Sequence, residues 1–216
     1  MTRKKQRSGN RQSLAKFKKG GEKLQFSSYT ITYDPLENKD ENLPKPVKDR
    51  LQDLYEMLRG NPKQVIEELL VLKENHPNVP RLYNFLSTAY EAIGDRTAAR
   101  EIIIENYQQN PDYLFAKLNY AQICLMDGDF DKIPGIFGGQ FDLKLLYPNR
   151  NCFHVTEFAG FTGVTCAYFA ATGKQETAQL LYKSLLEVAP DSNMIEFARR
   201  FFYPSLQTKL MDLMDR

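Results

Sequence analysis

The sequence predicts an all-α protein, an α-solenoid of about four helix hairpins, in a chain of 216 residues. The first observation is a set of glycines that close apolar helical stretches at spacings of 34, 34 and 45 residues: Gly60, Gly94, Gly128 and Gly173. The second is that Pro77 and Pro111, also 34 residues apart, each end a second helix. The third is that one hairpin cannot bury its apolar face alone, so the units must stack.

The rest of the chain divides into segments around these repeats. Residues 1–21 are expected to be a disordered basic arm, and residues 22–44 an extended segment followed by an acidic linker. The predicted repeat units are about 45–79, 80–113, 114–158 and 159–192. Capping helices are expected in residues 193–216, because a stack of repeats needs a polar outer face at its end.

The second unit carries the repeat most clearly. Its signature positions hold Tyr83, Leu86, Ser87, Tyr90, Gly94, Ala99 and Pro111. In these residues the unit resembles a tetratricopeptide repeat, and Ile103 departs from the aromatic that the family prefers. The third unit departs most, with Lys117 at an aromatic position and 11 inserted residues. The resemblance covers about 170 residues.

The resemblance implies a non-catalytic protein that binds a partner on the concave side, which the first helices line. It places these residues on that side: Arg81, Asn84, Thr88, Glu91, Phe115, Leu118 and Gln122. A face that is polar at one end and apolar at the other suits a helix or an extended peptide. In the fourth unit the same positions hold small residues, which either bind a ligand or allow the C-terminal helix to pack: Gly160, Gly163, Ala167 and Ala170.

The insertion in the third unit contains GIFGGQF. It lacks the Lys and Ser/Thr of a phosphate-binding loop, so a broken second helix is expected instead. Insertions in repeat arrays often lie on a binding face. Phe137 and Phe141 are therefore candidates for exposed anchors of a partner.

Cys152, His154 and Glu157 are the candidates for a catalytic or metal site. A zinc site would need about four ligands, and these residues supply at most three. The simpler interpretation is a loop between repeats with a hydrogen-bonded His154. The sequence thus predicts no enzyme, no metal and no cofactor.

The segment LQFSSYTITY, residues 24–33, has an alternating end in Tyr29, Ile31 and Tyr33, which is typical of an extended or β segment. Two interpretations stay open. The segment docks on its own chain, which we favour because its apolar side chains gain by burial, or it is a strand offered to a partner.

The basic arm suggests a second function. The arm contains eight cations and no acid, although the whole chain has a net charge of only +2. These cations are Arg3, Lys4, Lys5, Arg7, Arg11, Lys16, Lys18 and Lys19. Such a composition suits phosphate contacts with RNA or a ribosome. A solvated tail, a nuclear or organellar address, and an anionic membrane surface are the other interpretations.

The leading hypothesis is therefore a cytoplasmic scaffold for protein–protein interaction, with a peptide or protein partner. The alternative is an RNA- or ribosome-associated factor that uses its basic arm. No apolar run approaches the length of a membrane span, and the sequence leaves the oligomeric state open. Deleting residues 1–21 should abolish association in the second case and leave it nearly unchanged in the first.

Overall fold

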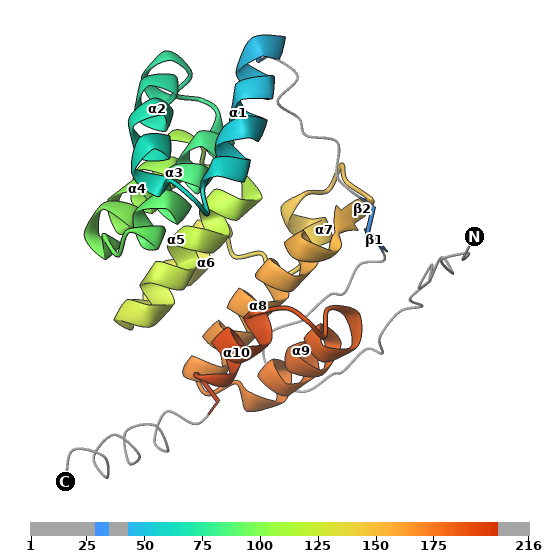
Figure 1. Cartoon of the computed structure of the whole chain (residues 1–216). Helices are drawn as coiled ribbons and strands as arrows, with labels where there is room; N and C mark the ends of the chain where they lie inside the picture. The colour runs from blue at the N-terminus through green and yellow to red at the C-terminus, as the bar shows by residue number, and fades with distance from the viewer. Residues whose placement is uncertain (1–28, 35–42, 203–216) are drawn as a thin grey trace, which may run out of the picture. The chain divides into compact units, whose positions relative to one another are not determined.

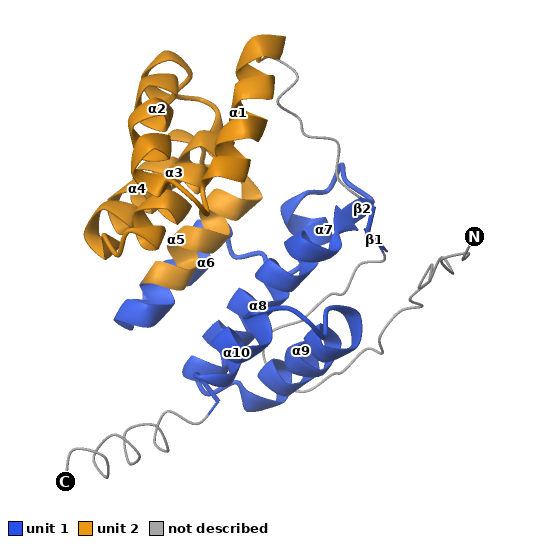
Figure 2. Ribbon diagram, viewed as in Figure 1, with its two compact units in different colours: residues 1–36, 124–216 blue, residues 37–123 orange. Residues whose placement is uncertain are grey.

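The computed structural model describes residues 29–34 and 43–202, which form two compact units (Figures 1 and 2). Unit 1 comprises residues 1–36 and 124–216, and unit 2 comprises residues 37–123. Three predicted features lie outside the described residues: the basic arm, most of the extended segment and acidic linker, and the last helix, expected in 205–216.

Unit 2 contains two complete helix hairpins and the start of the next helix. Its elements are α1 (Lys45–Met57), α2 (Pro62–Asn75), α3 (Pro80–Ala92), α4 (Arg96–Gln109) and the first part of α5 (Leu114–Asp127). Helix α3 packs against both α2 and α4. Pro62 and Pro80 each occupy the first residue of a helix, where the missing N–H has no intrahelical partner to lose.

The core of unit 2 is made by the inward faces of the helices. Its most buried members have 0% exposed surface and are mainly leucines: Leu51, Leu54, Val65, Leu69, Leu82, Leu86 and Ala89. They recur every three or four residues along each helix, which is the spacing of one helical face. The periodicity seen in the sequence is therefore the periodicity of burial.

Three of the four hairpin glycines adopt the left-handed conformation that ends a helix. Gly94, Gly128 and Gly173 have φ of 81°, 82° and 79°. After Gly94, the Asp95 N–H returns to the Tyr90 carbonyl oxygen at 2.9 Å, as in a Schellman cap. Gly60 does not share this conformation, because no positive φ occurs there.

Unit 1 contains a short parallel sheet and the fourth hairpin. After the end of α5 come η1 (Phe130–Lys132), α6 (Ile133–Ile136), α7 (Leu143–Leu146), β2 (Cys152–His154), α8 (Val155–Ala171), α9 (Gln175–Val188) and α10 (Met194–Arg199). Helix α8 packs against α9 and α10 and is buried along most of its length. Helices thus dominate the described residues and consecutive helices pack together, which confirms the all-α class.

The third predicted repeat, residues 114–158, has a broken second helix, as its sequence predicts. The short elements η1 and α6 replace a full helix, and the chain then turns at Gly138 and Gly139, with φ of 56° and 72°. The fourth predicted repeat, residues 159–192, starts earlier than expected. Its first helix, α8, begins at Val155 because a capping box fixes its start.

The small residues of α8 allow the C-terminal helix to approach. A Cβ atom added at Gly163 would lie 2.7 Å from the Met194 Cβ atom of α10, closer than two carbon atoms can pack. Gly160, Ala167 and Ala170 are buried as well. Of the two interpretations for these positions, packing of a C-terminal helix is confirmed.

The segment before unit 2 docks on its own chain. Strand β1 (Thr30–Thr32) pairs in parallel with β2, and Ile31 lies opposite Phe153. The Tyr29 ring meets the Phe153 ring edge-on, with centroids 5.2 Å apart, and the Tyr33 hydroxyl donates to the Val188 carbonyl oxygen at 2.7 Å. The intramolecular interpretation of residues 29–33 is confirmed.

Candidate functional site

The exposed side of α1 and α3 in unit 2 carries an aromatic and cationic strip formed by Tyr55, Phe85 and Arg81. We call these three residues the aromatic strip. Tyr55 is 55% exposed, and its ring centroid lies 5.3 Å from that of Phe85. The Arg81 guanidinium lies over the Phe85 ring, 5.4 Å from its centroid, within cation–π range.

The strip follows from helical spacing. Arg81, Phe85 and Thr88 are at positions i, i+4 and i+7, so they share one side of α3. The opposite side holds Leu82, Leu86 and other core residues of unit 2. Burial of that side by its leucines leaves Arg81, Phe85 and Thr88 on the partly exposed side.

All four predicted groove residues on α3 remain at least partly exposed, and Asn84 is half-buried. Thr88 and Glu91 are exposed, and Arg81 is half-buried in the aromatic strip. The Thr88 hydroxyl donates to the Asn84 carbonyl oxygen at 2.9 Å, so one of its hydrogen bonds is made within the helix. These residues are placed where a partner could reach them.

Asn84 instead joins helices. Its side-chain oxygen accepts from the Asn106 amide of α4 at 3.1 Å and from the Asn119 amide of α5 at 3.5 Å. Asn106 is 2% exposed, and Asn84 and Asn119 are half-buried, so this polar network is partly buried in unit 2. Because a buried amide without a partner is costly, the network fixes how α3, α4 and α5 meet.

The α5 part of the predicted groove is only partly available. Leu118 is 1% exposed, so the prediction that it contacts a partner is wrong: its side chain belongs to the core. Phe115 is half-buried, with its ring centroid 5.7 Å from that of Tyr113. Gln122 is half-buried too, and its amide donates to the Leu118 carbonyl oxygen at 3.4 Å.

The insertion places its phenylalanines against α8. Phe137 is fully buried, and its ring meets that of Phe161 edge-on, with centroids 5.3 Å apart. The prediction of an exposed anchor is therefore wrong for Phe137. Phe141 is half-buried and stacks on Tyr168 at 5.2 Å. Both rings fill space left by the broken helix.

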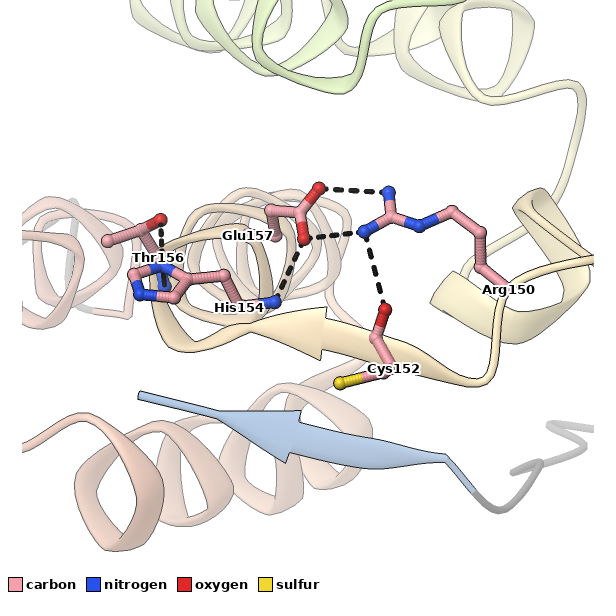
Figure 3. Close-up of polar contacts among 5 residues, drawn as sticks. All are labelled: Arg150, Cys152, His154, Thr156 and Glu157. Carbon is pink, nitrogen blue, oxygen red and sulfur yellow. Dashed lines mark hydrogen bonds and ion pairs between the residues drawn. The ribbon is translucent and has the colours of Figure 1, made fainter. Parts of the chain in front are cut away.

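The residues around β2 form a structural cluster, shown in Figure 3. The Glu157 carboxylate accepts from both terminal nitrogens of Arg150, at 2.9 and 2.7 Å. It also accepts from the His154 backbone N–H at 2.9 Å, and the His154 ring bonds to Thr156. In Figure 3 the Cys152 sulfur points away from the Glu157 carboxylate, so Cys152, His154 and Glu157 do not converge.

Arg150 and Glu157 close one edge of the sheet. The Thr30 N–H donates to the Asn151 carbonyl oxygen at 2.8 Å, so the backbone groups of Asn151 face β1. In a parallel pair, successive residues point their backbone groups alternately toward and away from the partner strand. Cys152 and His154 therefore turn their backbone groups away from β1. Glu157 accepts from the His154 N–H, and Arg150 donates to the Cys152 carbonyl oxygen at 3.4 Å. The ion pair therefore takes the place of a further strand.

Burial shifts the pKa values of three titratable groups, Cys166, Lys117 and Tyr83. Burial raises the pKa of the Cys166 thiol to about 12, so the thiol stays protonated near neutrality. Burial lowers the pKa of Lys117, an effect that the nearby Asp112 carboxylate opposes. Burial also raises the pKa of Tyr83, whose hydroxyl donates to the Pro77 carbonyl oxygen at 2.8 Å.

Residues 29–34 and 43–202 contain neither a cluster suited to a metal ion nor a helix suited to crossing a membrane. No group of three or more His, Cys, Asp or Glu side chains is arranged there to hold a metal ion. No helix there has the length and apolar character that crossing a membrane requires. The eight cations of the basic arm lie outside the described residues.

Sequence reasoning missed the two arrangements that matter most here. The contact of Tyr55 with Phe85 joins separate hairpins and has no local signal in the sequence. Arg150 was missed as well. The capping box had only half of its usual sequence signal: Glu157 is a usual third residue of a helix, but His154 is not one of the usual N-cap residues.

Comparison of the chain with protein-family models, with curated proteins and with solved structures finds no match.

Proposed function

We propose that this chain is a non-catalytic interaction protein that holds a peptide or protein partner on the exposed side of α1 and α3. The single observation that carries the proposal is the aromatic strip. Tyr55 keeps more than half of its surface in water although Phe85 lies beside it. Tyrosine and arginine are the residue types that most often dominate binding energy at protein interfaces.

The composition of the strip suggests how a partner would bind. The aromatic ring of Tyr55 and the cation of Arg81 both lie against the ring of Phe85. This pattern suits a segment with an apolar anchor next to a carboxylate, because the anchor covers the rings and the carboxylate pairs with the guanidinium. The tetratricopeptide resemblance supports the same use, since stacked hairpins present their first helices to ligands.

The experiment is affinity capture with a double variant, Tyr55→Ala with Arg81→Ala. Phe85 is kept because it packs on the core of unit 2. We expect a partner of the wild type to be lost from the variant by roughly tenfold or more, since interface hot spots contribute 2 kcal/mol or more. The matched control is Val71→Ala on α2, because Val71 is 58% exposed in the same unit but lies outside the strip.

A melting curve for each variant shows whether a loss of capture comes from unfolding. Equal retention by the wild type, the double variant and the Val71→Ala control would exclude the aromatic strip as the binding site. Loss in both variants would also contradict the proposal, because it would show that retention depends on general surface apolarity.

A second function has its own support in the sequence. Eight cations in residues 1–21, without any acid, favour phosphate contacts with RNA or a ribosome. Strand β1 docks a later part of the same N-terminal segment on unit 1. If the arm provides the affinity, association falls steeply with salt and disappears when residues 1–21 are removed.

A further inference from the structure

The sheet of unit 1 has one closed edge and one open edge. On the β2 side, the pair of Arg150 and Glu157 occupies the outward backbone groups of Cys152 and His154. In the described part of the chain the sheet contains β1 and β2 alone, so the other edge is β1. An open strand edge is a template for pairing with another strand.

Ile31 is the residue that presents this edge. Thr30 donates its N–H to the Asn151 carbonyl oxygen and so faces β2. Because successive residues alternate in a parallel ladder, the N–H and C=O of Ile31 point away from β2. In an antiparallel pair, one residue that turns both groups outward can exchange two hydrogen bonds with a residue opposite it.

The sequence around Ile31 reads the same in both directions: Tyr29-Thr30-Ile31-Thr32-Tyr33. Antiparallel pairing of two such segments about Ile31 puts each Thr30 opposite a Thr32, and each Tyr29 opposite a Tyr33. Thr–Thr and aromatic pairs across strands are both stabilising. The segment is therefore complementary to itself under a two-fold axis, which is the usual symmetry of a dimer.

The side chains of this segment do not block the pairing of another strand with β1. Tyr29, Ile31 and Tyr33 share one side of the strand, where Tyr29 contacts Phe153 and Tyr33 bonds to Val188. Thr30 lies on the other side and is exposed, and Thr32 is half-buried. The segment carries no Lys, Arg or Pro, the residues that commonly block edge pairing.

We propose that a second copy of this chain pairs antiparallel with the β1 edge about Ile31, which gives a four-stranded sheet of order β2-β1-β1-β2. The contact is small, so the dimer is weak and depends on concentration. This interface is separate from the aromatic strip, and its failure would leave the proposed binding function unaffected.

The test uses paired charges in the full-length protein. One double variant carries Thr30→Lys and Thr32→Lys, and the other carries Thr30→Glu and Thr32→Glu. In each variant alone, like charges lie opposite each other across the two-fold axis, so we expect sedimentation equilibrium to show the dimer fraction reduced by roughly tenfold. When the two variants are mixed, Lys lies opposite Glu and the dimer returns as a heterodimer.

Each variant also loses the hydrogen bond in which the Asp34 N–H donates to the Thr32 hydroxyl at 3.0 Å. Both double variants share this loss, so the mixture controls for it. A third variant, Ile31→Pro, removes the outward N–H but none of the hydrogen bonds between β1 and β2, and it should be monomeric.

Three outcomes would overturn the proposal: a wild type that stays monomeric at several hundred micromolar, a dimer that both charge variants retain, or two monomeric variants that do not associate when mixed.

Discussion

Gly94 and Gly60 close equivalent helices, but their backbones differ. Gly94 has a φ of 81°, where any L-residue is strained, whereas Gly60 has no positive φ. We predict that Gly94→Ala lowers the free energy of unfolding by about 1–2 kcal/mol. Gly60→Ala should change it by less than about 0.5 kcal/mol. Urea denaturation of both variants tests this, and equal losses would contradict the account of these caps.

Cys166 links stability to alkaline pH. Its Sγ atom donates to the Ala178 carbonyl oxygen at 3.2 Å, and burial raises its pKa from an ordinary 9.0 to about 12. The unfolded chain therefore loses this proton at lower pH than the folded chain. The stabilising contribution of Cys166 is complete below pH 9.0 and is lost as the pH rises towards about 12.

We predict that unfolding free energies measured in urea at pH 8 and pH 10 fall less steeply with pH in Cys166→Ala than in the wild type. Cys152→Ala is the control, because Cys152 is exposed. If the unfolding free energy falls equally with pH in all three proteins, the pKa of Cys166 does not differ between the folded and unfolded chains, which would contradict the prediction.

Among the secondary-structure elements, β2 depends on side chains for one of its edges. Glu157 is 7% exposed and Arg150 is 28% exposed. Glu157→Ala would leave the Arg150 guanidinium and the His154 N–H without their shared partner. We predict a loss of about 3 kcal/mol in unfolding free energy. This is the lower end of the cost of breaking a buried ion pair, because Arg150 still reaches water.

The control for this prediction is Glu196→Ala. Glu196 pairs with Arg199 at 3.1 Å, but their side chains are 61% and 60% exposed, so the change should cost less than about 1 kcal/mol. Similar melting shifts in the two variants would mean that the Arg150–Glu157 pair contributes no more than a surface pair.

The elements also show which features a sequence can predict. The bounds of the hairpins followed from glycines, prolines and apolar spacing, since a helix and its ends depend on neighbouring residues. Phe137 and Leu118 were placed wrongly, because their burial depends on residues distant along the chain. Arg150 was missed for the same reason: its contacts with the outer edge of β2 exist only once β2 has formed.

For the whole molecule, we propose that the helix hairpins of unit 2 bind a partner and that the basic arm is an accessory. Unit 2 supplies the aromatic strip, whereas the arm precedes β1 in unit 1. The two sources of affinity respond differently to salt. Contacts with phosphates weaken steeply as salt rises, whereas an apolar contact on Tyr55 and Phe85 depends on it only slightly.

The most direct measurement is affinity capture with the full-length protein and with a form that lacks residues 1–21, each at low and at high salt. Our account predicts that both forms retain the same protein at both salt concentrations, and that Tyr55→Ala with Arg81→Ala releases it. Retention of RNA or ribosomal particles only at low salt, and only when residues 1–21 are present, would contradict it and assign the binding to the arm.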